Sequence, residues 1–139
     1  MNAVATIPLD LAELDLIEAW SKADPSERVR FTFVVNAETG SDRCALAYVE
    51  LLPGGAVPRH SDGADEFVIV LTGEVDVEID GEPTTAAEGA LVHFPAGVRH
   101  RISNAAEQKA RLVLFFDRPS HAVSFDEPLM PMDVRVLGE

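Results

Sequence analysis

The sequence consists of short apolar runs separated by turns, and this pattern limits the chain to a β-rich fold. In the clearest run Val75, Val77 and Ile79 alternate with acidic residues, and Asp80-Gly81 then closes a tight hairpin. Nine glycines and nine prolines supply turns throughout the chain. The other strands are predicted at residues 29–35, 45–52, 65–71, 90–94, 99–103 and 111–116. About eight short strands of this kind predict an all-β sandwich or small barrel.

The two ends of the chain carry weaker patterns. Apolar residues between positions 10 and 22 follow helical spacing, which predicts a short helix with Trp20 on the face that packs against the barrel. Residues 1–8 are expected to form an arm or an added edge strand. Residues 119–139 hold three prolines between positions 119 and 131 and are predicted to be a wrapped extension with at most a short strand at 134–136. We expect residues 1–139 to form a single domain.

The charge balance argues against nucleic-acid and membrane partners. The chain has 24 Asp and Glu against 11 Lys and Arg, a formal net charge of −13. Such a surface repels phosphate backbones and anionic lipids, because nucleic-acid affinity depends largely on cations. The sequence shows neither a secretory leader nor 18 consecutive apolar residues, so a cytoplasmic protein is expected.

Two stretches carry the residues suited to chemistry, one at 54–73 and the other at 89–104. The first has the spacing Gly54-x5-His60-x-Asp62-x3-Glu66-x6-Gly73, and the second has Gly89-x5-Pro95-x-Gly97-x2-His100-x3-Asn104. Residues i and i+2 of an extended chain share a face, so His60 and Asp62 project together. Glu66 lies on an otherwise apolar strand face, where an unpaired charge is costly and a cation is the expected partner. The four glycines are expected at turns with positive φ.

These two stretches resemble the two signature motifs of the cupin superfamily at every spacing and at every motif residue but one. The departure is Asp62, where the cupin pattern usually has a second histidine. The resemblance implies a jelly-roll barrel, also called a double-stranded β-helix, and frequent homodimers. It also implies that His60, Asp62, Glu66 and His100 hold a metal ion inside the barrel. The reaction does not follow from the resemblance, because cupins include oxygenases, isomerases, decarboxylases, lyases and binding domains.

The ligand types indicate one divalent transition metal. Two neutral imidazoles with carboxylate oxygens suit Fe(II), Mn(II), Zn(II), Ni(II) or Co(II), and a carboxylate in place of an imidazole shifts the preference toward Fe(II) or Mn(II). Asp62 has an alternative role, because its shorter arm could instead orient a histidine or a bound water from outside the ligand shell. Imidazoles bind metal only when neutral, so acidification should release the ion.

Three further residues are candidates for the substrate pocket: Tyr48, His93 and Arg111. Arg111 could pair with a substrate carboxylate. The set of His60, Asp62 and His100, with Arg111 further along, also resembles the facial triad and co-substrate arginine of 2-oxoglutarate-dependent oxygenases. The chain is short for that family, and Glu66 belongs to the cupin pattern.

Three functions remain open on the sequence. The leading hypothesis is a metal-dependent enzyme acting on a small organic molecule, with an Fe(II)-type dioxygenase placed first and a redox-neutral lyase, isomerase or cyclase second. The contrasting hypothesis is a non-catalytic module that binds a small ligand. Both faces of the strand at 65–71 are apolar, so we expect its outer face to be covered by the N-terminal helix or by a second subunit.

Overall fold

The computed structural model describes residues 8–139, which contain twelve strands and two short 3₁₀ turns. The turns are η1 (Leu11–Glu13) and η2 (Ala37–Thr39). The strands are β1 (Ile17–Ser21), β2 (Arg28–Val35), β3 (Ala45–Leu51), β4 (Ala56–Asp62), β5 (Glu66–Thr72), β6 (Glu74–Ile79), β7 (Glu82–Ala87), β8 (Leu91–Phe94), β9 (His100–Ser103), β10 (Ala110–Phe116), β11 (Val123–Met130) and β12 (Val134–Leu137).

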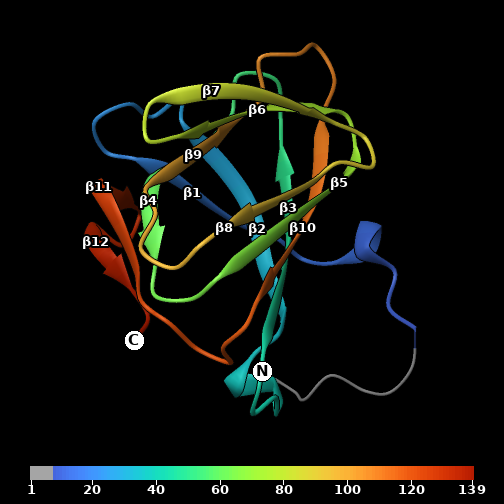
Figure 1. Ribbon diagram of the computed structural model, residues 1–139, viewed down its shortest axis with the longest axis vertical. Coiled ribbons are helices and arrows are strands. Elements are labelled where there is room, and N and C mark those ends of the chain that lie inside the picture. Colours follow the sequence, from blue (N-terminus) through green and yellow to red (C-terminus); the bar gives the residue numbers. More distant parts are fainter. Residues whose placement is uncertain (1–7) are drawn as a thin grey trace.

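The strands form one antiparallel sheet that curls into a barrel (Figure 1). Its order is β7-β6-β9-β4-β11-β1-β2-β3-β10-β5-β8, and β12 pairs with β11 beside this path. Strands distant in sequence therefore lie side by side, as where β4 pairs with both β9 and β11. The predicted all-β jelly-roll barrel is confirmed.

The core fills the inside of the barrel with alternate residues from most of the strands. Val68 and Val70 of β5, Val75 of β6 and Leu112 of β10 are each at most 1% exposed. Their sequence neighbours point to the outer surface, as the period of two predicts. The inner face of the sheet is therefore apolar and shielded from solvent. A polar group on that face is costly unless it has a partner.

The predicted N-terminal helix is wrong. Only Leu11–Glu13 form a 3₁₀ turn, capped by the Asp10 side chain, and Ile17–Ser21 form strand β1 instead. These residues form a strand because it fills the space between β2 and β11 and hydrogen-bonds to both. An isolated short helix, by contrast, is marginal in water. Trp20 accordingly lies on β1, with the guanidinium of Arg28 4.3 Å from its ring centroid. Within residues 8–139, no helix is long and apolar enough to cross a membrane. Residues 1–7 of the expected arm lie outside the described residues.

The C-terminal segment is more regular than predicted. It contains β12 near the predicted position, and it also contains β11, which sequence reasoning missed. Pro128 argued against a strand because it cannot donate to a ladder. In the structure the pairing of β11 with β12 is irregular between Ser124 and Leu129, and the proline falls in that interval.

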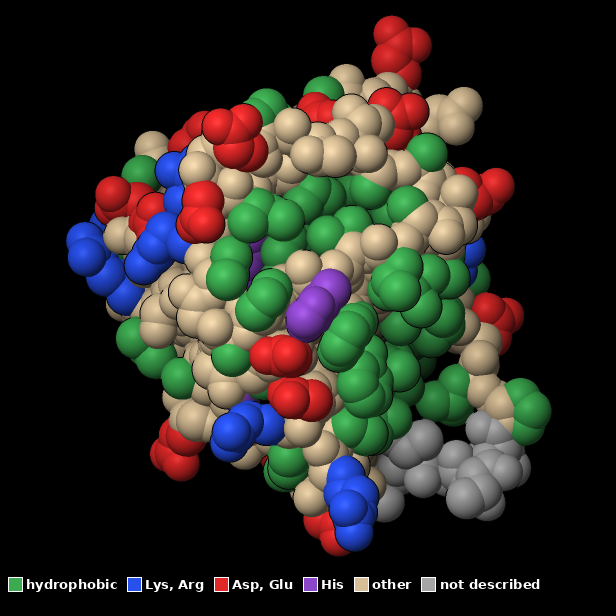
Figure 2. Space-filling model, viewed as in Figure 1, with side chains coloured by type: hydrophobic (Ala, Val, Ile, Leu, Met, Phe, Trp, Pro, Cys, Tyr) green, Lys and Arg blue, Asp and Glu red, His purple; other side chains and the backbone are tan. Residues whose placement is uncertain are grey.

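Among the described residues no helix covers the outer face of β5, because the predicted N-terminal helix does not form. Ile69 is 43% exposed, and its neighbours Leu91 on β8 and Phe115 on β10 are 64% and 38% exposed. Figure 2 shows a gathering of hydrophobic side chains on one face of the molecule, over the place that these strands have in Figure 1. Coverage by a second subunit stays a prediction.

Candidate metal centre

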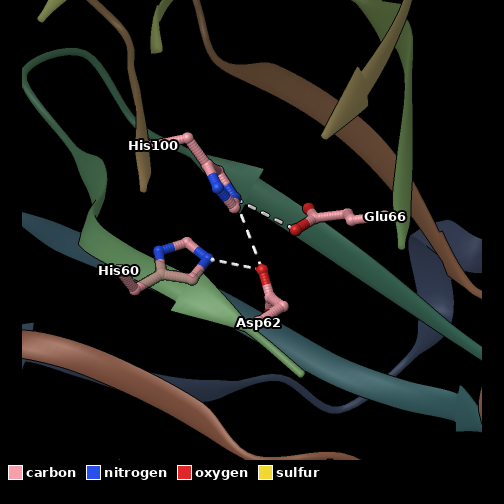
Figure 3. A group of neighbouring side chains, drawn as sticks. All are labelled: His60, Asp62, Glu66 and His100. Atoms are coloured by element: carbon pink, nitrogen blue, oxygen red, sulfur yellow. Dashed lines mark hydrogen bonds and ion pairs between the residues drawn. The ribbon is translucent and has the colours of Figure 1, made fainter. Parts of the chain in front are cut away.

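Three strands bring the four predicted ligands together inside the barrel. His60 and Asp62 project from the inner face of β4, Glu66 begins β5, and His100 begins β9 opposite His60. One potential ligand atom from each residue lies within 4.8 Å of the others. Figure 3 shows the four side chains pointing toward one another. Their exposed fractions lie between 0% and 5%, so the group is shielded from solvent.

The two imidazoles are fixed by hydrogen bonds to the backbone. His60 donates its Nδ1–H to the Pro58 carbonyl over 2.7 Å, and His100 donates its Nδ1–H to the Val98 carbonyl over 2.9 Å. A neutral imidazole that donates from one nitrogen carries a lone pair on the other. Both Nε2 lone pairs therefore face the centre of the group, the orientation that metal-ligating histidines generally have.

The carboxylates add further lone pairs to the same small space. Asp62 Oδ2 lies 3.3 Å from His60 Nε2 and 3.4 Å from His100 Nε2. Among the residues that the structure describes, Asp62 Oδ2 and Glu66 Oε2 are buried without a hydrogen-bond partner. Buried acceptors that face one another without a proton are costly, and a cation between them removes that cost. The donor set thus fits a metal ion.

Burial and neighbouring groups shift the pKa values of three of these four residues when no ion is bound. Burial and the neighbouring Asp62 charge raise the pKa of Glu66 well above its usual value. Burial also acts to raise the pKa of Asp62, but the hydrogen bond from His121 and the nearby His60 outweigh it and hold that pKa below its usual range. Burial lowers the pKa of His100, which favours the neutral imidazole that a metal requires. One carboxylate is therefore ionised, and the other tends to keep a proton.

Two motif residues hold the surrounding backbone in place. Asn104 donates its side-chain amide to the carbonyls of Leu51 and Gln108, and its own carbonyl accepts from Gly54, so the end of one motif is tied to the start of the other. Gly73 has a φ of +85°, and an added Cβ would lie 2.9 Å from the backbone of β10. This turn therefore requires glycine for both its conformation and its close packing. The other three motif glycines also have positive φ, as predicted.

A cavity of about 80 Å³ opens beside three of the four candidate ligands inside the barrel. His60, Asp62 and Glu66 form its polar end, and the rest of its wall is apolar. The aromatic part of the wall comes from β2, β10 and β11: Phe31, Phe33, Phe116 and Phe125. No Lys or Arg among residues 8–139 lines this cavity.

The family model of the cupin domain matches residues 47–116, half of the chain. The chain is a cupin. The match includes β4, β5 and β9, the three strands that carry the candidate ligands.

Similar proteins include two that are named for polyketide synthesis and one from Myxococcus xanthus that is named as an endoribonuclease. This cupin is 29% identical over 85 residues to the polyketide synthase protein CurC of Streptomyces cyaneus, with 59% of this chain and 54% of CurC covered. The chain thus spans about half the length of the curated relatives it matches.

Two solved structures share the fold at lower identity. The polyketide cyclase RemF from Streptomyces resistomycificus superposes with a TM-score of 0.67 at 19% identity and 84% coverage of both chains. A putative sugar phosphate isomerase from Acidithiobacillus ferrooxidans gives 0.66 at 20% identity and 93% coverage of both chains. These two likenesses show the fold alone.

The three predicted pocket candidates do not line the cavity of this cupin. Tyr48 and Arg111 lie on the outer face of the barrel, because their neighbours Ala47, Val49 and Leu112 point inward. There Arg111 donates to the Tyr48 hydroxyl over 2.7 Å, which in turn donates to Glu50. A co-substrate arginine at the site, as in 2-oxoglutarate-dependent oxygenases, is therefore not provided by Arg111.

The third candidate, His93, is also turned outward. Its imidazole is 44% exposed, stacks on Phe67 with the ring centroids 4.5 Å apart, and pairs with Asp65 over 3.2 Å. Adjacent residues of a strand point to opposite faces, and the next residue, Phe94, is fully buried, so His93 points outward.

Sequence reasoning missed His121, which reaches the group from the C-terminal segment. Its Nε2 lies 3.2 Å from Asp62 Oδ1, and its side chain is 3% exposed. No signal in the sequence points to it, because it lies 59 positions from Asp62 and belongs to neither motif.

Proposed function

We propose that this cupin is an enzyme that uses one divalent metal ion, held by His60, Asp62, Glu66 and His100, to act on a small and largely apolar organic molecule. The observation that carries the proposal is the convergence of four buried ligand atoms at the polar end of an otherwise apolar cavity. Fe(II) and Mn(II) suit two imidazoles with two carboxylates best.

The cavity wall supports an uncharged substrate body. A substrate phosphate or carboxylate away from the metal would find no Lys or Arg among the described residues that line the cavity, and an unpaired anion is costly in such a place. Aromatic side chains instead offer flat contacts to an apolar or aromatic molecule. The similarity to CurC and the likeness to RemF, which are named for polyketide synthesis and cyclisation, point the same way.

Redox-neutral carbonyl chemistry, such as cyclisation, is the reaction that these features favour. A bound metal ion supplies Lewis acidity for a carbonyl oxygen. The phenylalanines of the wall would exclude water from a bound carbonyl chain and hold it in a folded shape. Asp62 stays ionised beside the two histidines, so the charge of the site is already in place before substrate binds.

Dioxygenation is the second candidate, and the donor set favours it. Two histidines with a carboxylate and open positions form the ligand pattern of non-haem Fe(II) oxygenases. The two reactions differ in what they consume. Cyclisation of a polyketone releases water and needs no oxygen, whereas a dioxygenase adds both atoms of O₂ to its substrate.

The proposal is tested with protein loaded with Fe(II) or Mn(II) and an apolar 1,3-diketone as the candidate ligand. We expect the diketone to raise the melting temperature of metal-loaded protein, and we expect His60→Ala to abolish both metal binding and this shift. His93→Ala is the matched control, since that histidine lies on the outer face. Turnover without oxygen would support cyclisation, oxygen uptake would support dioxygenation, and binding without turnover of any substrate would support a binding module. Absence of metal binding by the wild-type protein would contradict the proposal.

A further inference from the structure

His121 contacts a proposed metal ligand from outside the ligand group. It lies just before β11, and its Nε2–H donates to Asp62 Oδ1 over 3.2 Å. Both side chains are 3% exposed. A hydrogen bond to a carboxylate that is shielded from water is stronger than one at the surface, so this contact is able to fix the position of its acceptor.

This hydrogen bond divides the two oxygens of Asp62 between two tasks. His121 holds Oδ1, while Oδ2 lies 3.3 Å from His60 Nε2 and 3.4 Å from His100 Nε2. The terminal torsion of an aspartate is broad, so anchoring one oxygen is what sets the plane of the carboxylate. The carboxylate arm is shorter than an imidazole, and a rotated carboxylate would withdraw Oδ2 from the other ligand atoms.

The imidazole of His121 is itself held in place. Gly63, which follows the aspartate, donates its backbone N–H to the Ala122 carbonyl over 2.9 Å. The ring packs on Phe116, with the centroids 4.4 Å apart. The chain end passes so close that an added Cβ on Gly138 would lie 2.5 Å from the His121 carbonyl oxygen. The donor and the acceptor therefore sit on backbones that are fixed against each other.

We propose that His121 is a positioning residue that orients Asp62 for metal binding, so that the C-terminal segment completes a site whose ligands all come from the two motifs. The inference rests on the proposed function, in which Asp62 is a ligand. It explains how an aspartate can replace the usual histidine at this position. Partners of this kind change metal affinity by roughly 10–100-fold when they are removed.

Titration of the metal-free protein with Co(II), followed by its absorption spectrum, tests the inference. His121→Phe keeps a ring but removes the donor, and we expect it to weaken Co(II) binding about 10–100-fold and to change the ligand-field bands. His121→Gln restores an N–H near the same place and should recover most of the affinity. His93→Phe, on the outer face, is the matched control and should bind as the wild type does. Unfolding of each metal-free variant shows whether it folds.

A double-mutant cycle separates positioning from a general packing role. If His121 acts through Asp62, His121→Phe will not weaken Co(II) binding further in a protein that already carries Asp62→Ala. The full loss in that background would overturn the inference, and so would wild-type affinity in His121→Phe or the same loss in His121→Gln. Failure of the wild-type protein to bind Co(II), Fe(II) or Mn(II) would overturn the proposed function and, with it, the inference.

Discussion

Metal binding should displace one proton from Glu66. In the metal-free protein His100 uses its Nδ1–H for the Val98 carbonyl, so its Nε2 carries a lone pair. Glu66 Oε1 lies 3.1 Å from that Nε2, and two lone pairs at this distance require a proton between them. Burial lowers the pKa of His100 and raises that of Glu66, which places the proton on the carboxyl group.

The pH dependence of metal affinity follows from the release of this one proton. Below the raised pKa of Glu66, each metal ion bound must release that proton. Metal affinity should therefore increase with pH by an extra factor of about ten per pH unit, or ~1.4 kcal/mol. Glu66→Gln removes the titrating group and keeps a side chain of the same shape, whose amide can donate to His100. Its affinity should be lower at high pH and should lack this additional slope.

Calorimetric titration in buffers of different protonation enthalpy measures the number of protons released. At a pH below the raised pKa of Glu66 the wild type should release about one proton more than Glu66→Gln, and any protons lost by the histidines cancel in the difference. The metal-free proteins give a second measurement. A carboxyl group whose pKa is raised in the folded state stabilises the fold fully below pH 4.5, and this contribution is lost as the pH rises through the raised pKa. Glu66→Gln should therefore become the more stable of the two proteins at high pH. Equal proton release by both proteins would refute the reasoning.

Three other perturbations have outcomes that the structure defines. Gly73→Ala should destabilise the protein by about 1–3 kcal/mol more than Gly81→Ala in urea unfolding, because both have a φ of +85° but only the first added Cβ meets the backbone; equal losses would contradict the packing argument. Tyr48→Phe should lower stability by about 1–2 kcal/mol and leave Co(II) affinity unchanged, because its hydroxyl bonds lie on the outer face; weaker Co(II) binding would place it at the site. The metal-free protein should lose stability as the pH falls below 3.8, through the lowered pKa of Asp62; Asp62→Asn should reduce this loss, and a circular dichroism melt at each pH checks this.

The candidate ligands could be predicted from the sequence because their motifs resemble those of the cupin superfamily, which implied the set of four. His60 and Asp62 share a strand face through the period of two, and Glu66 and His100 begin strands at fixed distances from turns. Spacing alone brings His60 and Asp62 together, whereas the pairing of β4 with β9 brings His100 to them. The departure at Asp62 was also visible in the sequence, but the partner that orients it was not.

The remaining features depend on contacts between segments far apart in the sequence. The residues around Trp20 have apolar spacing that suits a helix, and only the space between β2 and β11 makes them a strand. His121 reaches Asp62 because β11 pairs with β4, a pairing that the prolines of the C-terminal segment argued against. Arg111 and His93 were ambiguous because a shift of one residue reverses which face a side chain occupies.

The place of β11 in the sheet has a consequence for the order of folding. This strand separates β1 from β4, so the earliest strand of the described residues and the strand with two candidate ligands both wait for a segment that is synthesised after β10. Until it arrives, each has an unpaired edge, and open edges invite pairing with other chains. Pairings over such a sequence distance also form slowly. Before β11 is made, the free edges of β1 and β4 beside the candidate metal centre are therefore open to aggregation.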